Sequence, residues 1–201
     1  MSVTAQQFEQ LKARLGGAKR EAAPVFESSL APAKRNQIII GIDPSLRGTG
    51  YGVIQCCKPS PRALAHGTIV CAAGWERSRC LARIAQAVRE IVARHRPSAG
   101  AIEGLFYAQN LQTALIMGEA RGAALAALAE AGLEIFEIAP RKVKQAIVGY
   151  GAAQKLAVGK MVQRMLQLTE APAPDAADAL AVALAYAQQS GRYALGGLKR
   201  I

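Results

Sequence analysis

The sequence predicts an α/β domain in which a mixed five-stranded sheet carries helices on both faces. The first apolar, β-branched runs are separated by a glycine-bearing turn, which indicates an antiparallel hairpin. After this opening, runs of strand length alternate with longer segments at helical spacing, which is typical of a mixed sheet rather than a doubly wound one. The chain has 201 residues, 51% of them apolar, which is enough for one domain with a core.

Each element follows from its local pattern. The run IIIGID is apolar and β-branched, as expected of a buried strand, and the turn PSLRGTG leads to a second strand, YGVIQCC. Gly118 and Gly122 lie one turn apart in a long helical segment and are expected to allow close helix packing, within the subunit or at a subunit interface. The predicted strands are 37–43, 51–57, 63–71, 98–106 and 133–139, and the predicted helices are 75–96, 109–131, 155–168 and 174–187.

The chain divides into one domain and two terminal segments. Residues 1–37 combine glycine, proline and serine with mixed charge and no sustained period, so they are interpreted as a flexible or weakly helical extension with one short helix over 4–15. Residues 38–190 form the predicted domain, and residues 191–201 form a C-terminal tail.

Cysteine usage and hydropathy indicate a reducing, aqueous environment. The four cysteines form no CxxC pair, and His66 and His95 lie in no zinc-ligand spacing, which favours free thiols in the cytoplasm. The longest apolar runs are interrupted by Glu and Gly well before the ~20 residues that a membrane span requires. No membrane association is therefore expected.

The net charge of +11 and the pI near 9.9 predict a polyanionic partner. The basic residues also gather, because no acidic residue occurs between Glu137 and Glu170. Such a cluster can be a solvated face or can attract a membrane surface, but no basic amphipathic helix with aromatic anchors accompanies it. Nucleic acid is the favoured partner. The basic residues of this stretch are Arg141, Lys142, Lys144, Lys155, Lys160 and Arg164.

Four acidic residues lie at unusual positions. Asp175 and Asp178 are three residues apart at the start of an otherwise apolar helix, where they either suit the helix dipole or point together at a metal ion. Asp43 ends the first strand and Glu103 lies within another apolar strand, although a turn-forming role for Asp43 and an arginine partner for Glu103 are alternatives. Four clustered carboxylates would repel one another unless divalent cations neutralised them. Two Mg²⁺ ions held by carboxylates support phosphodiester hydrolysis.

The motifs that contain these acids resemble those of the bacterial RuvC-type Holliday-junction resolvases. The resemblance runs in order from about Ile38 to Gln189, through GIDPSLRGTGYGVI, AIEGLFYAQN, MGEARGAAL, RKVKQAIVGYGAAQK and DAADALAVALAYA. It implies a ribonuclease-H-like fold and a homodimer that cleaves four-way DNA junctions with two Mg²⁺ ions per site, for which Mn²⁺ can substitute. It also implies a branch-migration motor as a possible partner in recombination and repair.

The resemblance assigns roles residue by residue. Asp43, Glu103, Asp175 and Asp178 match the family's four metal-binding catalytic acids. Lys155 and Lys144 match lysines that contact DNA near the cleaved phosphate, with Lys155 counted among the catalytic residues, and Phe106 resembles an aromatic residue that stacks on junction bases unless it packs in the core. Arg141 and Lys142 are further candidates for DNA contacts.

Some features depart from this pattern, and other functions compete with it. The N-terminal extension is foreign to the family, Ser45 stands where glycine is usual, and residues 55–75 match poorly. The glycine-bearing hairpin is also similar to the phosphate loop of actin-like kinases, but those proteins need a second such lobe. A branched-DNA-binding module without cleavage activity and another ribonuclease-H-like nuclease are the remaining alternatives.

Overall fold

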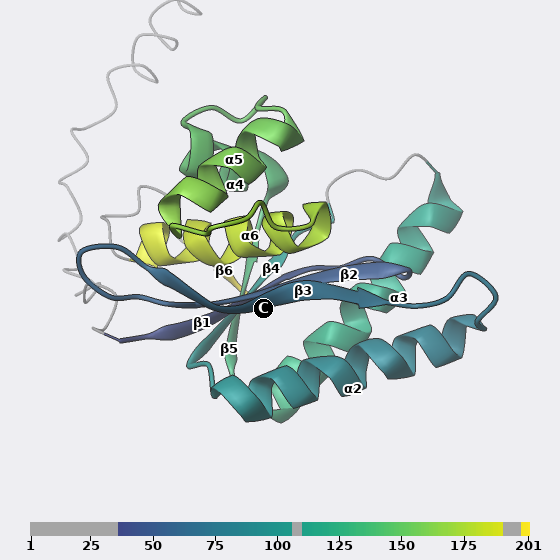
Figure 1. Cartoon of the computed structure of the whole chain (residues 1–201). Coiled ribbons are helices and arrows are strands. Elements are labelled where there is room, and N and C mark those ends of the chain that lie inside the picture. The colour runs from purple at the N-terminus through teal and green to yellow at the C-terminus, as the bar shows by residue number, and fades with distance from the viewer. Residues whose placement is uncertain (1–35, 106–109, 191–197) are drawn as a thin grey trace, which may run out of the picture.

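The computed structural model describes residues 36–105, 110–190 and 198–201, which form a six-stranded sheet between two layers of helices (Figure 1). The strand order is β3-β2-β1-β4-β5-β6. The expected α/β arrangement with helices on both faces is confirmed. The strands are β1 (Ile38–Asp43), β2 (Gly48–Gln55), β3 (Arg62–Val70), β4 (Ala99–Glu103), β5 (Glu134–Ile138) and β6 (Lys199–Arg200).

The sheet is mixed, as the sequence predicts. Strands β1, β2 and β3 are joined by short turns and pair antiparallel, whereas β4 and β5 follow helical crossovers and pair parallel to β1 and to each other. In the β1–β4 register, Ile42 lies opposite Ile102, so the last residues of both strands, Asp43 and Glu103, meet at one edge of the sheet. The parallel centre of the sheet therefore brings two acidic residues together.

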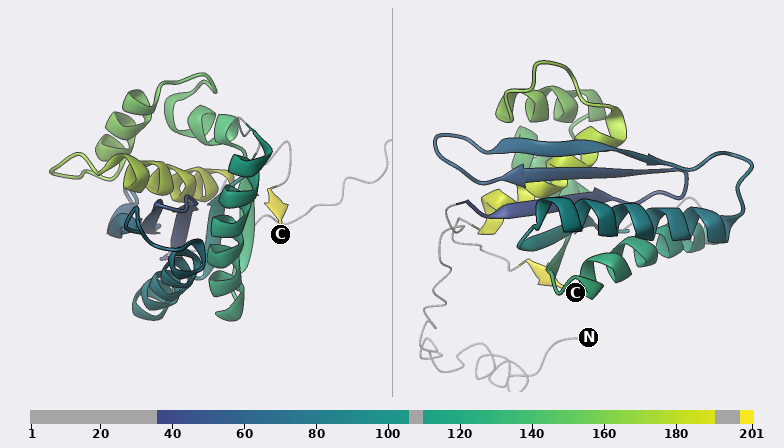
Figure 2. Two further views of the ribbon diagram at one scale, coloured as in Figure 1. Left: turned by 90° about the vertical axis from the view of Figure 1, so that its right-hand side faces the viewer. Right: turned by 60° about the horizontal axis from the view of Figure 1, so that its bottom comes forward.

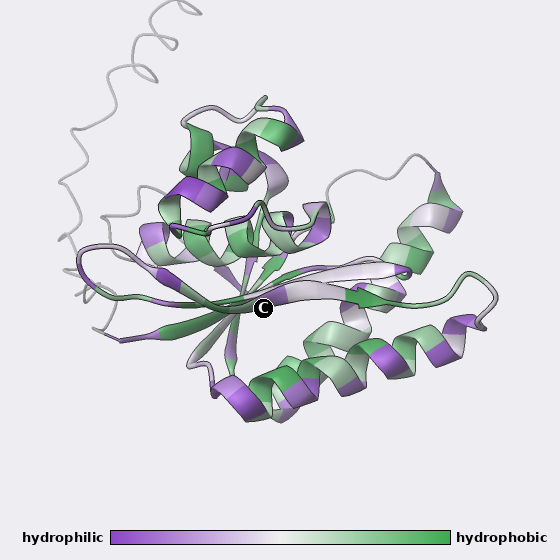
Figure 3. Ribbon diagram, in the orientation of Figure 1, coloured by the Kyte–Doolittle hydropathy of each residue, from purple (hydrophilic) through white to green (hydrophobic). Residues whose placement is uncertain are grey.

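The helices form two layers with separate apolar cores. Helices α2 (Arg77–His95) and α3 (Leu111–Glu130) cover one face, and α4 (Pro140–Val148), α5 (Lys155–Met165) and α6 (Pro174–Ser190) cover the other (Figures 1 and 2). Figure 3 shows the apolar residues of α2 facing the sheet and the polar residues facing outward. Of the helices in the described ranges, each is too short or too polar to cross a membrane.

Helix α6 lies unusually close to the sheet because glycines face it. A Cβ atom on Gly41 would lie 2.2 Å from the carbonyl oxygen of Ala179, and one on Gly50 would lie 2.0 Å from that of Asp175. Gly52 likewise faces Leu180 at 2.8 Å. Such distances leave no room for any side chain at these positions. The small residues of α6 and the glycines of β1 and β2 thus fix the height of the helix above the strands.

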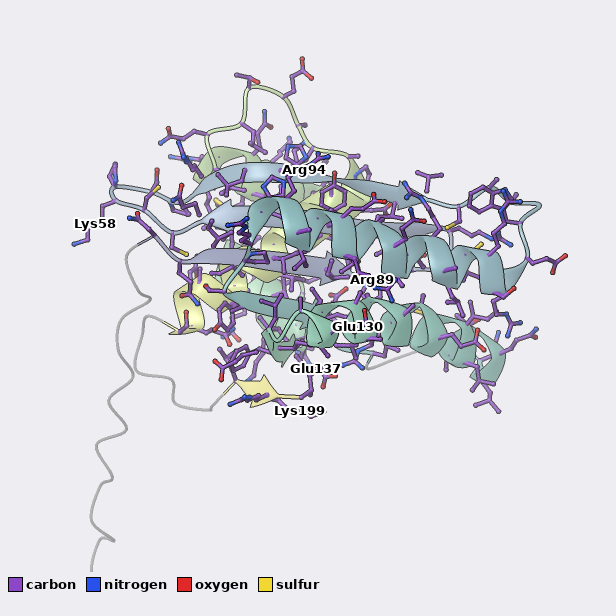
Figure 4. The ribbon with its side chains drawn as sticks, turned by 90° about the horizontal axis from the view of Figure 1, so that it is seen from below. Lys58, Arg89, Arg94, Glu130, Glu137 and Lys199 are labelled. Atoms are coloured by element: carbon purple, nitrogen blue, oxygen red, sulfur yellow. The ribbon has the colours of Figure 1, made fainter. Side chains whose placement is uncertain are left out.

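The sheet has six strands rather than the five that the sequence predicts. Strand β6 consists of Lys199 and Arg200, which fall in the expected C-terminal tail and pair antiparallel with β5. Lys199 Nζ lies 2.8 Å from Glu137 Oε1, and Arg200 Nη1 lies 2.8 Å from Glu134 Oε1 (Figure 4 shows the Lys199–Glu137 pair). A two-residue charged strand has no apolar alternation, so hydropathy could not reveal it.

Helix α4 is a second element that the predicted order omits. Its buried residues are Val143 and Ile147. It begins at Pro140 and is followed at its C-terminal end by Gly149, whose φ is 96°. Proline at a helix start and glycine in the left-handed conformation just beyond its end are ordinary boundary signals. The basic residues between these signals obscured them in the sequence.

The expectation that Gly118 and Gly122 allow close packing within the subunit is wrong. A Cβ atom on either glycine would meet nothing within 4 Å in the described part of the chain. The buried face of α3 is formed instead by Ala120, Ala124, Ala127 and Leu128. The glycine face of α3 is therefore directed away from the core.

Candidate active site

The site is centred on the carboxyl groups of Asp43 and Glu103 at the ends of the parallel strands β1 and β4. Their side chains lie within hydrogen-bonding reach of each other. Two carboxylates can share a hydrogen bond only if one of them carries a proton. Burial, the hydrogen bond to Glu103 and the nearby negative charges together raise the pKa of Asp43 to about 8.

The pKa of Glu103 is also raised, chiefly by burial and further by the charge of Asp178. The hydrogen bond from Asp43 and the charges of Lys155 and Lys144 act in the opposite direction. At neutral pH the pair therefore retains a proton that two exposed carboxyl groups would lose. A bound cation could replace that proton, because it would favour the ionised form of both groups.

Helix α6 supplies the third acid of this cluster. Asp178 lies in the first turns of α6, and its charge raises the pKa values of both strand acids. Its Oδ2 atom accepts a hydrogen bond from Lys155 Nζ at 2.8 Å. The Asp178 side chain is 19% exposed, so the carboxylate lies at the wall of the site.

Asp175 takes a different position. Its Oδ2 atom lies 2.9 Å from the place where Gly48 would carry a Cβ atom, so the carboxyl group rests against the first residue of β2. Gly48 and Gly50 thus permit the approach of α6 and belong to the supporting structure of the site. These glycines are not among the predicted site residues, although glycines alternating in GTGYG are a recognised sign of close backbone approach in a strand.

Two lysines stand beside the acids. Lys155 is the first residue of α5, and the hydrogen bond to Asp178 raises its pKa, with further contributions from the charges of Asp43 and Glu103. Lys144 lies on α4, close enough for its charge to lower the pKa of Glu103. Both lysines therefore lie near the acidic cluster, and their predicted contacts with DNA stay a prediction.

A cavity of about 380 Å³ opens beside the strand acids. Arg141 is one of its lining residues, whereas Lys142 is an exposed residue of α4 outside that lining. Phe106 follows the lining residue Leu105 but lies outside the described residues, so its predicted role stays a prediction. The lining consists of Asp43, Pro44, Glu103, Gly104, Leu105, Met117, Ala139, Pro140 and Arg141.

The acids form a buried carboxyl pair, Asp43 and Glu103, and an ion pair between Asp178 and Lys155 rather than a preformed metal cage. Within residues 36–105, 110–190 and 198–201, no three His, Cys, Asp or Glu side chains lie in an arrangement that could hold one ion. The donor set nevertheless suits a hard divalent cation, since carboxylate oxygens are the ligands that Mg²⁺ prefers. The assignment of all four acids to one metal site stays a prediction.

Acidic residues at adjacent parallel strand ends, a third acid from a facing helix and flanking lysines define a class. They are typical of ribonuclease-H-like enzymes that cut nucleic-acid backbones, in which carboxylates hold the metal and cations contact the phosphates.

Known proteins that closely resemble this chain belong to this class and, within it, to one family. Residues 39–186 match the sequence profile of the family described as crossover junction endodeoxyribonuclease RuvC. A protein of that description from Rubrobacter xylanophilus is 44% identical over 156 residues, which cover 77% of this chain and 87% of the relative. Another, from Acinetobacter baylyi, is 46% identical over 170 residues, covering 81% and 93%.

Solved structures give the same result. The T. thermophilus RuvC in complex with a Holliday junction substrate superposes with a TM-score of 0.76 at 35% identity, covering 82% of this chain and 99% of that one. The chain belongs to the RuvC family of crossover junction endodeoxyribonucleases. The family resemblance and the ribonuclease-H-like fold class predicted from the sequence are therefore confirmed.

Proposed function

We propose that this protein resolves four-way DNA junctions by paired, metal-dependent hydrolysis of phosphodiester bonds during recombination and repair. The observation that carries the proposal is the pair of buried carboxyl groups, Asp43 and Glu103, side by side at the ends of β1 and β4, with Asp178 beside them. The T. thermophilus relative, which has the same fold, is described as bound to a Holliday junction. Residues 38–190 form the nuclease domain in this proposal.

The proposed cofactor is Mg²⁺, with two ions per site and Mn²⁺ as a substitute. Asp43, Glu103, Asp175 and Asp178 would hold it through their carboxylate oxygens. When bound, the metal supplies an activated water and stabilisation of the negative charge that develops on the phosphate. The buried carboxyl pair suits this role because burial, and after it the neighbouring acids, raise its pKa values, and a bound cation would favour the ionised form of both groups.

The chain's own cations bind and orient the DNA backbone. Lys155 is 76% exposed while its Nζ contacts Asp178, so the same ammonium group can reach a phosphate at the acidic cluster. Lys144 and Arg141 lie on α4 at the border of the site and would hold the strand that enters the cavity. Lys142 is exposed on the same helix and would contact phosphates farther along, and Phe106 would stack on an unpaired base.

The proposed assembly is a two-fold homodimer, since a junction has two-fold symmetry and two matched nicks yield clean duplexes. Helix α3 offers the surface for it. The side chains of Leu111 and Leu115 are 76% and 58% exposed, and the uncovered Gly118 and Gly122 continue the same face. An apolar helix face with glycines allows two backbones to approach closely. We place the protein in the cytoplasm, and the branch-migration motor stays a proposal from the family resemblance.

Cleavage assays on several substrates test the function. A labelled four-way junction, a duplex of the same sequence and an RNA–DNA hybrid would be incubated with the protein, with and without Mg²⁺. We expect paired nicks in the junction alone, and only with the metal. Preferential cleavage of the hybrid would assign a ribonuclease activity instead. Binding of the junction without cleavage in Mg²⁺ or Mn²⁺ would reduce the protein to a branched-DNA-binding module.

Four variants test the proposed acids in the same assay. We expect Asp43→Asn, Glu103→Gln, Asp175→Asn and Asp178→Asn each to lose cleavage and to keep junction binding, because neutral isosteres remove metal ligands but no phosphate contact. The exposed Glu170→Gln is the matched control. Normal turnover by any of the four would remove that residue from the site.

A further inference from the structure

We propose that Arg47 is a positioning residue for the acidic site, which it serves by tying the turn between β1 and β2 to the helical layer on the far side of the sheet. The inference rests on the proposed function, because it concerns the geometry of the same carboxylates. The turn consists of residues 44–47, directly after Asp43.

One side-chain nitrogen of Arg47 connects the turn to three acceptors elsewhere in the chain. Its Nη1 atom donates to the carbonyl oxygens of Ala72 at 2.5 Å and Trp75 at 3.1 Å, and to Cys80 Sγ at 3.2 Å. Its backbone oxygen accepts from the amide of Cys71 at 3.1 Å. Arg47 itself is exposed, but Cys80 is fully buried on α2, so one nitrogen of the guanidinium group contacts the border of that layer. Hydrogen bonds from a charged donor are stronger than neutral ones.

The residues that follow the turn are the first two of β2. Gly48 follows Arg47 directly, and its backbone forms the surface against which Asp175 Oδ2 rests. Thr49 is fully buried, and its hydroxyl donates to the Ser45 carbonyl at 2.5 Å and accepts from the Ser45 amide at 3.3 Å. The turn is thus closed internally by Thr49 and fixed externally by Arg47. A shift of the turn would move Asp43 and the support of Asp175 together.

The contacts of Arg47 indicate that it positions the turn rather than acting on the site through its charge. The acceptors of Arg47 are two carbonyl oxygens and a sulfur atom, which orient the side chain toward α2 rather than toward the cavity of Asp43 and Glu103. Small displacements of catalytic groups lower rates steeply, since an error of about 1 Å can cost about a hundredfold.

The test compares Arg47→Met, Arg47→Lys and the control Arg79→Met. Arg79 lies in the first turn of α2, where its guanidinium carbon stacks 4.1 Å from the Trp75 ring centre, so the control removes an equal charge near the same loop without touching the turn. We expect Arg47→Met to lower the single-turnover cleavage rate at saturating junction about ten- to a hundredfold. We also expect a higher Mg²⁺ concentration at half-maximal rate, with unchanged junction affinity and salt dependence.

Lysine should restore part of the rate, because a single ammonium nitrogen can donate to the same three acceptors. Hydrogen exchange gives a readout independent of activity: amides of residues 45–50 should exchange faster in Arg47→Met, while those of β4 keep their protection. Arg79→Met should match the wild type in every measurement. Together these results would separate a local effect on the turn from a general loss of stability.

Several outcomes would overturn the inference. Wild-type rate and metal dependence in Arg47→Met would show that the contacts do not position the site. A loss of affinity with a salt slope lower by about one would identify Arg47 as a phosphate contact instead. Faster exchange throughout the sheet, or equal losses in Arg79→Met, would assign the effect to overall stability. Failure of the wild type to cut junctions would refute the proposed function and would leave the exchange result to decide the role of Arg47.

Discussion

Replacing Asp43 by asparagine should stabilise the metal-free protein while it removes cleavage. Burial and the neighbouring acids raise the pKa of Asp43 to about 8, so the folded protein retains a proton at pH 7 that the unfolded chain releases. The stability of the wild type therefore falls as the pH rises from about 4 to about 8 and levels off above that range. Asparagine does not titrate, and its amide can still donate to Glu103.

The size of this stabilisation follows from the shift in the pKa of Asp43 between the unfolded and the folded chain. With a pKa of 3.8 in the unfolded chain and about 8 in the folded one, the full linkage at pH 7 is about 4 kcal/mol. Asp43 and Glu103 lie side by side, and their side chains can move apart when both are ionised. This rearrangement would lower the free-energy cost of losing the proton below the full linkage value. We therefore expect a gain of ~2 kcal/mol, which corresponds to ~4–8 °C in melting temperature for a chain of this size.

Thermal unfolding followed by circular dichroism in EDTA, between pH 4 and pH 9, measures this gain. The melting temperatures of the wild type and Asp43→Asn should coincide near pH 4, where the carboxyl group is protonated, and diverge toward pH 8. Glu170→Gln, in the exposed loop before α6, should show no such divergence. Added Mg²⁺ should stabilise the wild type more than the variant, because the metal needs the ionised carboxylates.

A pH-independent difference between the two proteins would refute the reasoning. It would mean that the asparagine acts through packing or hydrogen bonding and that Asp43 does not carry the retained proton. A lower melting temperature for the variant at pH 8 would contradict both the sign and the cause.

Three further predictions concern the flanking surface. Lys155→Ala should lower the single-turnover rate about a hundredfold at saturating junction with little change in affinity, because its ammonium group lies at Asp178; equal rates would exclude it from the site. Lys144→Ala should weaken binding and reduce the salt slope by about one, whereas Lys199→Ala, whose charge is paired with Glu137, should leave the slope unchanged in the same titration. Leu115→Asp should convert the proposed dimer to monomers in sedimentation at micromolar concentration and uncouple the two nicks; a variant that stays dimeric would move the interface away from α3.

The sequence was sufficient for the central fold because the patterns there are strong. The residues before Asp43 in the run IIIGID carry no polar side chain. A buried strand of this kind can end in an acid only where the acid reaches solvent or belongs to a functional site. The pairing of β1 with β4 was not deducible from either strand alone, although it brings Asp43 and Glu103 together. The register depends on the helical crossover between the two strands, which a local pattern does not specify.

Other features escaped because they are set by tertiary contacts. Strand β6 pairs with β5 through its backbone, and both of its side chains form ion pairs with β5. Two charged residues near the end of the sequence give no strand signal. Gly118 suggested internal packing, but the sequence pattern cannot say which face of an Ala-rich helix is covered. The role of Arg47 was hidden for the same reason, since its three acceptors come from residues 25 to 33 positions away.

The glycines beneath α6 have a consequence for the genetics of this protein. A Cβ atom added to Gly41, Gly50 or Gly52 would lie between 2.0 and 2.8 Å from the nearest atom of the helix, so there is no room even for a methyl group. A change to alanine at any of them would lift α6 and carry Asp175 and Asp178 away from the strand acids. Selection should therefore keep these positions as strictly as the acids themselves, although none of the three can ligate a metal. In a saturation screen for repair-deficient alleles, they should form a second class of intolerant sites, distinguished from the acids by reduced amounts of folded protein.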